Sequence, residues 1–271
     1  MNLSFTNVML TLPNGTVTPL TSANAAFTGN TGTNGNNIDI AYASAPRATS
    51  PPQVSSGAVI NGASFAVGAP LGPGSIAWVL GSGFGSSAAG VTVLVGGIVA
   101  PLFAVTPQQI NFQVPWQLFG QTQAAVTVTS GDLTSAPITV PVANLAPGIF
   151  LLTSSGQGAA LVANTASIAA PAAAFPSSRP AQRGEFLSIY CTGLGPVTHQ
   201  PATGAPAGGN PVSLPAGNTT ASIGGLPATV SFSGLAPGYP GLYRVNVQVL
   251  SNAPIGSAVP LTISVGGKIS N

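Results

Sequence analysis

The sequence predicts an all-β protein in which two tandem antiparallel β-sandwiches follow an extended N-terminal arm. Short runs that alternate apolar and polar residues, such as "VTVLVGG", "INFQV" and "YRVNVQV", recur along the chain, and Gly, Pro and Asn turns separate them. Alternate side chains of a strand point to opposite faces, so a period of two indicates half-buried strands. Many short strands between such turns favour a sandwich.

The strand pattern occurs twice. The segment "PGSIAWVLGSGFG" aligns with "RGEFLSIYCTGLG", "INFQVP" aligns with "VNVQVL", and the same alignment matches Ser135 with Ser270. Self-similarity of this kind indicates repeated structural units. We therefore expect one sandwich at residues 57–143 and a second at residues 144–271, joined by the short segment "VANLAPGIF". The second sandwich carries a long insertion, "AALVANTASIAAPAAAFPSSRPAQ".

The sequence before the first sandwich has a different character. Residues 44–56, "SAPRATSPPQVSS", are rich in Pro and Ser, which is typical of an extended linker. The arm at residues 1–43 contains two strand-like pieces, "NLSFTNVMLTL" and "NIDIAYA". Between them lies Asn/Gly/Thr-rich sequence that we expect to build no core by itself.

Several long motifs, in order, carry a resemblance to a known family. They include "GAVINGASF", "APLFAVTPQQINFQVPWQL", "RGEFLSIYCTGLGPV" and "GLPATVSFSGLAPGYPGLYRVNVQV". Over roughly residues 57–271 the chain resembles the tandem C-terminal Ig-like domains of secreted acidobacterial (Solibacter-type) proteins. The resemblance implies Ig-like sandwiches of exported proteins and assigns no catalytic residue. Family members usually continue into a final Val/Ile-rich strand, which this sequence lacks, and the Asn-rich arm is not part of the pattern.

The composition excludes several classes of function. Charged residues make up only 3% of the chain, with five Lys and Arg in total, whereas nucleic-acid binding needs clustered cations. No apolar run approaches the roughly 18–20 residues that span a bilayer. The scarcity of Lys and Glu, together with abundant Ser, Thr and Asn, favours an extracellular or cell-surface location.

The sequence offers little chemistry for catalysis or for a cofactor. The single histidine, His199, lies in the turn-rich stretch "GPVTHQPATG" and is expected to be a solvated loop residue. The single cysteine, Cys191, alternates with Leu187 and Ile189 and is expected in the core. Clustered Cys and His for zinc, and grouped carboxylates for calcium, are both missing from the sequence. We therefore expect neither an enzyme nor a metal or cofactor site.

The end of the second repeat differs from the end of the first. The segment "VTVTSGDLTSAPITVPV" reads as a strand, a turn and a closing strand, whereas the terminal "TISVGGKISN" matches only the strand and the turn. A sandwich without its closing strand exposes an edge that can pair with another chain. The expected acceptor edge carries Leu261, Ile263 and Val265. The candidate donor strands lie in the arm, and their apolar residues are Leu3, Phe5, Met9, Ile38, Ile40 and Tyr42.

Three interpretations of the absent strand remain open. A neighbouring subunit donates its arm, and a homopolymer grows by donor-strand exchange. The arm completes its own second sandwich, since a 13-residue linker spans at most about 43–47 Å. Finally, the sequence is a fragment whose last strand is not included. The first interpretation predicts a structural subunit of a fibre or surface layer.

A glycan-binding or adhesive module of a longer secreted protein is the alternative function. Aromatic side chains on the surface of such domains can stack on sugars, and Trp116 and Tyr239 are the candidate exposed aromatics. Trp78 lies within a strand and is expected in the core. Deleting the arm distinguishes the two functions, because it should abolish strand exchange and leave sugar binding intact.

Overall fold

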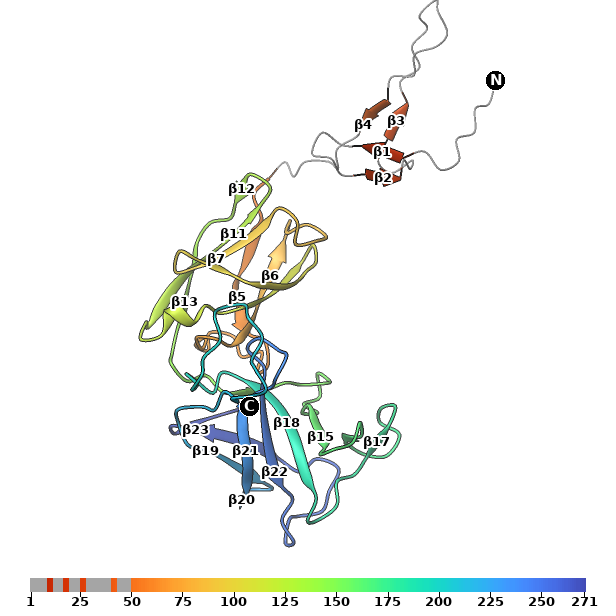
Figure 1. Ribbon diagram of the computed structural model, residues 1–271, viewed down its shortest axis with the longest axis vertical. Coiled ribbons are helices and arrows are strands. Elements are labelled where there is room, and N and C mark those ends of the chain that lie inside the picture. The colour runs from red at the N-terminus through yellow and green to blue at the C-terminus, as the bar shows by residue number, and fades with distance from the viewer. Residues whose placement is uncertain (1–8, 12–16, 20–24, 28–39, 43–49) are drawn as a thin grey trace, which may run out of the picture. The chain divides into compact units, whose positions relative to one another are not determined.

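The computed structural model describes residues 9–11, 17–19, 25–27, 40–42 and 50–271 (Figure 1). The chain forms two compact units, Met1–Thr49 and Ser50–Asn271, and each is described by itself. Apart from one 3-10 turn, η1 (Trp116–Leu118), every regular element in the described part of the chain is a strand. The predicted all-β class is confirmed.

The N-terminal unit contains two antiparallel strand pairs. Strand β1 (Met9–Thr11) pairs with β2 (Val17–Pro19), and β3 (Ala25–Phe27) pairs with β4 (Ile40–Tyr42). Each pair forms a sheet of two strands. A sheet of two strands is only marginally stable by itself in water.

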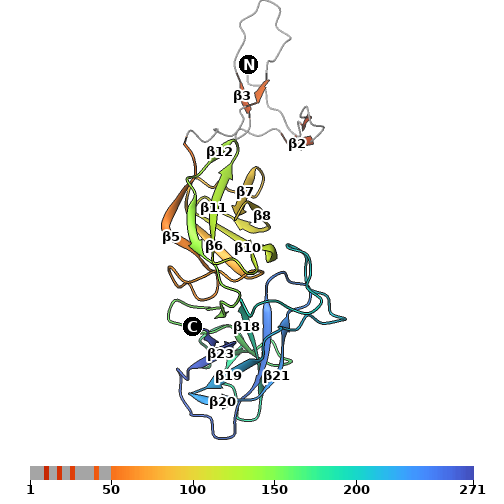
Figure 2. The same ribbon diagram turned by 90° about the vertical axis from the view of Figure 1, so that its left-hand side faces the viewer.

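The first sandwich packs two antiparallel sheets around one apolar core (Figures 1 and 2). The first sheet has the order β5-β6-β10-β9, and in the second the order is β12-β11-β7-β8 with β13 also paired to β11. The strands are β5 (Gln53–Asn61), β6 (Ile76–Ser82), β7 (Val91–Val95), β8 (Ile98–Ala100), β9 (Leu102–Val105), β10 (Gln109–Gln113), β11 (Gln123–Ser130), β12 (Leu133–Thr134) and β13 (Ile138–Pro141). Alternate residues of β7 are buried, as the period of two predicts.

The second sandwich repeats this arrangement and adds to it. One sheet has the order β17-β16-β15-β18-β22-β21 with β14 paired to β18, and the facing sheet has the order β20-β19-β23-β24. The strands are β14 (Gly148–Ile149), β15 (Ala160–Val162), β16 (Ile168–Ala169), β17 (Ser178–Arg179), β18 (Phe186–Thr192), β19 (Thr219–Ile223), β20 (Leu226–Ala228), β21 (Val230–Leu235), β22 (Tyr243–Gln248), β23 (Leu261–Val265) and β24 (Lys268–Ile269). Strand β15 takes the position beside β18 that β5 has beside β6, so the insertion starts later than predicted and adds only β16 and β17.

The two sandwiches match strand by strand. Strand β10 pairs with β6 so that Asn111 lies opposite Trp78, and β22 pairs with β18 so that Asn246 lies opposite Ser188. The hairpin β19–β20 turns at Gly224–Gly225, where both residues have positive φ values of 61° and 79°. Such turns favour glycine because it carries no Cβ.

The start of the first sandwich differs from the expected boundary. Residues 44–56 are predicted to be a linker, but β5 begins at Gln53. Its first residues pair with β6 through Gln53 and Ser82, and the pairing is then interrupted before Val59. The residues "QVSS" alternate too weakly to be recognised as a strand, and pairing with β6 orders them.

The junction between the sandwiches is held by buried polar contacts. Asn61 Nδ2 donates to the carbonyl oxygen of Ala146 at 2.9 Å, and Ile76 N donates to Thr192 Oγ1 at 3.0 Å. Thr192 is fully buried and its hydroxyl donates in turn to the carbonyl oxygen of Gly241 at 2.7 Å. Because buried polar groups are costly to leave unpaired, these bonds favour a single arrangement of the two sandwiches.

Candidate functional site

The edge of β23 is the clearest difference between the two repeats. In the first sandwich β11 lies between two partners, since it pairs with β7 on one side and with β13 on the other, where Val126 lies opposite Ile138. In the second sandwich β23 pairs with β19 along its whole length. On its other side only Ser264 and Val265 have a strand partner, in β24. Within the described part of the chain no strand takes the position of β13.

Backbone hydrogen bonds locate the open part of this edge. Ile263 N donates to Ser270 Oγ at 3.0 Å, and Ser270 N donates to the carbonyl oxygen of Ile263 at 2.9 Å. In the first sandwich Val128 and Ser135 make the same two bonds. Every second residue of a strand directs its backbone N–H and C=O groups to the same side. The backbone groups of Leu261 therefore point to the same edge of β23 as those of Ile263. The open edge therefore lies at Leu261 and the preceding residues.

The predicted acceptor edge needs a correction. Ile263 and Val265 are 0% and 1% exposed and belong to the core, and their own hairpin already covers the edge beside them. Leu261 and Val259 are partly buried against that core and border the open edge. The acceptor edge is thus shorter than predicted, because Ser270 and β24 close its far end.

The structure places the candidate donor residues in the N-terminal unit. Met9 lies in β1 opposite Pro19, and Ile40 and Tyr42 lie in β4 opposite Phe27 and Ala25. The remaining candidates lie outside the described residues; they are Leu3, Phe5 and Ile38.

The expected exposure of Trp116 is wrong. Its side chain is only 5% exposed and packs in the core of the second sandwich, although η1 belongs to the chain of the first. A Cβ added to Gly74 would lie 2.2 Å from the Trp116 ring, so the indole packs directly on that backbone. Tyr239, by contrast, is 59% exposed. Trp78 is partly buried and meets Phe65 edge-on at 4.6 Å between ring centroids.

The described residues bring no reactive groups together. His199 is an exposed loop residue with a φ of 47°. Cys191 is fully buried, and its burial raises the pKa of the thiol far above its ordinary value. No group of three His, Cys, Asp or Glu that could hold a metal is found among residues of the described ranges. Likewise, no helix in this part of the chain is long and apolar enough to cross a membrane.

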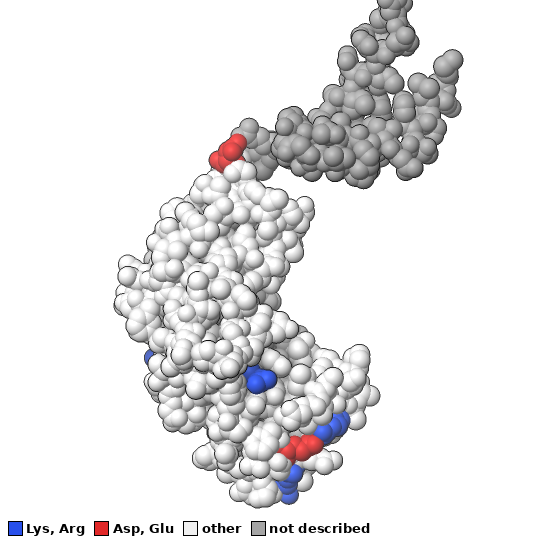
Figure 3. Space-filling model, viewed as in Figure 1, with Lys and Arg blue, Asp and Glu red and all other residues white. Residues whose placement is uncertain are grey.

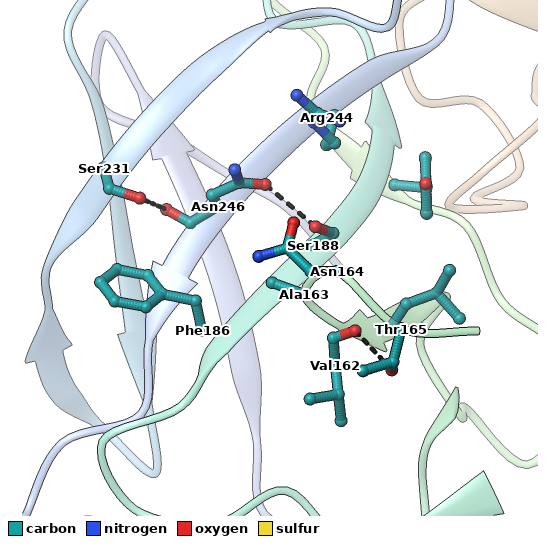
Figure 4. Close-up of a pocket in the computed structure, with 11 residues that line it drawn as sticks. Val162, Ala163, Asn164, Thr165, Phe186, Ser188, Ser231, Arg244 and Asn246 are labelled. Atoms are coloured by element: carbon teal, nitrogen blue, oxygen red, sulfur yellow. Dashed lines mark hydrogen bonds between the residues drawn. The ribbon is translucent and has the colours of Figure 1, made fainter. Parts of the chain in front are cut away.

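A cavity on the second sandwich was not predicted from the sequence. It has a volume of about 360 Å³ and lies on the side of the β18–β22 sheet that faces away from the core (Figure 4). Its polar lining includes Arg244 and Asn246 from β22 and Ser188 from β18, and the segment Leu161–Thr165 at the end of β15 forms a wall. These residues are ordinary outward-facing positions in the sequence, so no local motif marks them.

Solved structures match this chain only distantly. Thirteen solved chains match, among them the plexin A4 extracellular region, at 11% identity and a TM-score of 0.34 over 87% of this chain and 19% of that one. The gamma-CGTase from alkalophilic Bacillus clarkii matches at 15% identity and a TM-score of 0.29, over 81% of this chain and 24% of that one. The I9–I11 tandem from titin matches at 10% identity and a TM-score of 0.21, over 82% of this chain and 62% of that one. The chain spans less than two thirds of each of these structures.

No curated protein matches the chain significantly. Residues 58–142, however, match the family model of the IPT/TIG domain. The matched residues run from β5 to just past β13 and include both sheets of the first sandwich. The first sandwich is therefore an IPT/TIG domain of the Ig-like type.

Proposed function

We propose that the protein is a non-catalytic, extracellular structural module whose second sandwich accepts a strand along the open edge at Leu261. The observation that carries the proposal is the difference between β11 and β23. Val126 of β11 pairs with both β7 and β13, whereas the corresponding Leu261 of β23 pairs only with β19. An unpaired edge beside an apolar core is a template for β-strand addition.

The first sandwich indicates how much a donated strand contributes. There β13 and the residue after it supply Val140 and Val142, each 5% exposed, to the core. Burying a side chain of this kind contributes about 1.5–3 kcal/mol, so two such residues contribute about 3–6 kcal/mol. A donor with two well-placed apolar residues would therefore stabilise the second sandwich substantially.

The donor in this proposal is the arm of a second copy. Strand β4 includes Ile40 and Tyr42, two residues with large side chains that alternate with Ala41 in the sequence. Successive copies joined head to tail in this way form an open assembly, because each copy offers one donor and one acceptor.

Composition and surface support the extracellular structural role. On the face shown in Figure 3 the charged side chains are few and most of the surface is uncharged. A chain with 3% charged residues repels its own copies weakly, which favours close assembly. The described residues hold no constellation of acids, bases and nucleophiles of the kind that catalysis requires.

Cysteine crosslinking between two variants tests the proposal. Ala258 is exposed beside the open edge, and Ala41 lies in the donor strand, so one variant carries Ala258→Cys and the other Ala41→Cys. Native Cys191 is buried and does not compete. After mixing and mild oxidation we expect a mixed disulfide dimer, since the two Cα atoms need to approach within about 7 Å. The matched control replaces Ala258→Cys with Ala166→Cys, an exposed position in the insertion.

Deleting residues 1–43 should abolish assembly, as seen by electron microscopy, and a peptide of residues 36–43 should bind the shortened protein and raise its unfolding temperature. Assembly that persists after the deletion would refute the proposal. A disulfide that forms only within the double variant Ala41→Cys/Ala258→Cys, and never between chains, would show that the arm completes its own sandwich instead.

A further inference from the structure

We propose that the cavity on the second sandwich binds an acidic sugar, with Arg244 as the ligand of its carboxylate. This inference is independent of strand exchange, because the cavity lies on the sheet that contains β18 and β22 and the open edge lies on the facing sheet. It rests on three features: a hollow where the first sandwich has a tryptophan, a cation with no carboxylate partner among the described residues, and a lining of amides, hydroxyls and aromatic rings.

The hollow exists because the second repeat has a small side chain where the first repeat has a large one. In the first sandwich Trp78 occupies this position on β6 and packs against Phe65. In the second sandwich the corresponding residue on β18 is Ser188, which lies opposite Asn246 as Trp78 lies opposite Asn111. Replacing an indole with a hydroxymethyl group leaves space above the sheet, and that space is the cavity.

The end of β15 and the turn after it border the space. Residues Leu161–Thr165 run from the end of β15 into the following turn and line the cavity (Figure 4). Asn164 is exposed in the left-handed region, with a φ of 61°. Thr165 is held by a bond from its hydroxyl to the carbonyl oxygen of Val162 at 2.8 Å. A cavity of about 360 Å³ is at the small end of sites for small molecules.

Arg244 supplies a charge that the described residues of the second sandwich do not neutralise. Its guanidinium carbon lies 5.0 Å from the centre of the Phe232 ring, and its buried Nε has no hydrogen-bond partner. Glu185, the acidic residue of this sandwich, is already engaged by Arg179 through two bonds of 2.7 and 3.0 Å. The rigid guanidinium fork suits a planar carboxylate, which it can bind through two parallel bonds.

The rest of the lining suits the hydroxyl groups of a sugar. Ser188 Oγ donates to Asn246 Oδ1 at 3.1 Å, which fixes the amide so that its NH₂ group is left to donate to a ligand. In the first sandwich the corresponding Asn111 Oδ1 likewise accepts a bond, from Gln109 Nε2 at 2.6 Å. Phe186 and Tyr190 are partly buried beside the cavity and offer apolar surface for the face of a pyranose ring.

Other ligand classes fit less well. Strands β18 and β22 are inner strands with partners on both sides, so a peptide cannot add to the sheet here as an extra strand. A phosphate site usually draws on several cations or on backbone N–H groups at a helix N-terminus, whereas one arginine lines this cavity. A ligand with a single carboxylate and several hydroxyls matches the lining best.

Titration calorimetry on the full chain tests the inference. The probes are tetramers of galacturonic, glucuronic and mannuronic acid, each compared with its methyl ester, which keeps the sugar and removes the charge. We expect at least one acid tetramer to bind and its ester to bind about ten- to hundredfold more weakly. Arg244→Gln should weaken binding of the acid tetramer by the same factor. Lys268→Gln removes the positive charge of an exposed residue outside the cavity and should leave the affinity for the acid tetramer unchanged.

Two further variants keep the test independent of folding defects. Ser188→Trp restores the indole of the first repeat, and we expect it to fill the cavity and abolish binding. Asn246→Asp conserves shape and places a carboxylate in the cavity, and we expect it to weaken binding of the acid by about tenfold or more. Equal binding of acid and ester, an unaffected Arg244→Gln variant, or no binding by any of the three acids would overturn the inference. Preferential binding of a peptide that ends in a free carboxylate would overturn it too.

Discussion

Replacing Trp116 with alanine should destabilise the second sandwich more than the first. The indole is 5% exposed and sits in the core of the second sandwich, although the preceding strand β10 belongs to the first. Its backbone N–H also donates to Thr203 Oγ1 at 3.2 Å, which adds a contact across the junction. Truncating a buried Trp to Ala typically costs about 3–5 kcal/mol, from lost burial and from the cavity left behind. We expect most of that loss in the second sandwich.

The chain offers a separate reporter for each sandwich. In the Trp116→Ala variant Trp78 is the remaining tryptophan, and it lies on the outer face of β6, partly buried against Phe65, so its fluorescence follows unfolding of the first sandwich. Cys191 is fully buried in β18, so its reactivity toward a thiol reagent in urea follows the second. With an m value of about 2 kcal/mol/M, Trp116→Ala should lower the urea midpoint of Cys191 exposure by about 1.5–2.5 M.

The neighbouring Phe119, which is 52% exposed, provides the matched control. Phe119→Ala should change the free energy of unfolding of either sandwich by no more than about 0.5 kcal/mol. If Trp116→Ala leaves the Cys191 transition unchanged and shifts only the Trp78 transition, the assignment of the indole to the second core is refuted.

Three further predictions concern polar contacts. Hydrogen bonding from Arg179 lowers the pKa of Glu185 from 4.5 to about 2. The ionised carboxylate therefore stabilises the fold above pH 4.5, and this stabilisation is lost as the pH falls toward 2. In the Glu185→Gln variant the unfolding temperature should depend less on pH over this range. Ser270→Ala removes the hydroxyl that binds Ile263 and should cost about 1 kcal/mol in urea unfolding. Thr192→Val leaves two buried backbone groups unpaired at the junction and should cost about 1–3 kcal/mol, monitored by the same Cys191 reactivity.

Alternation and self-similarity were sufficient to predict the fold. The run "VTVLV" folds as β7 with every second residue buried, and the aligned runs around Ile110 and Val245 form the corresponding strands β10 and β22. These features are local, because a strand that buries one face must alternate wherever it lies. The core position of Cys191 followed from the same rule and is confirmed.

Features that depend on distant contacts could not be predicted in this way. Trp116 follows a strand end, and only the approach of Gly74 and the second sandwich buries it. Alternation placed Leu261 and Ile263 on one face of β23, but it could not show that Ser270 closes the edge beside Ile263. The sequence pattern specifies which way a side chain points, whereas its neighbours are set by the tertiary structure.

The cavity was missed for a different reason, and that reason helps to separate the two proposals. The cavity arises at a position where the two repeats differ, with Trp78 in the first and Ser188 in the second. This difference predicts a cavity only once the two aligned strands are known to have the same pairing register. The open edge is likewise a difference between repeats, but it lies on the facing sheet. Because a packed core separates the two surfaces, filling one should leave the other available. Asn246→Asp should therefore leave the crosslink at Ala258 intact, and a protein already joined through that crosslink should still distinguish an acidic sugar from its ester.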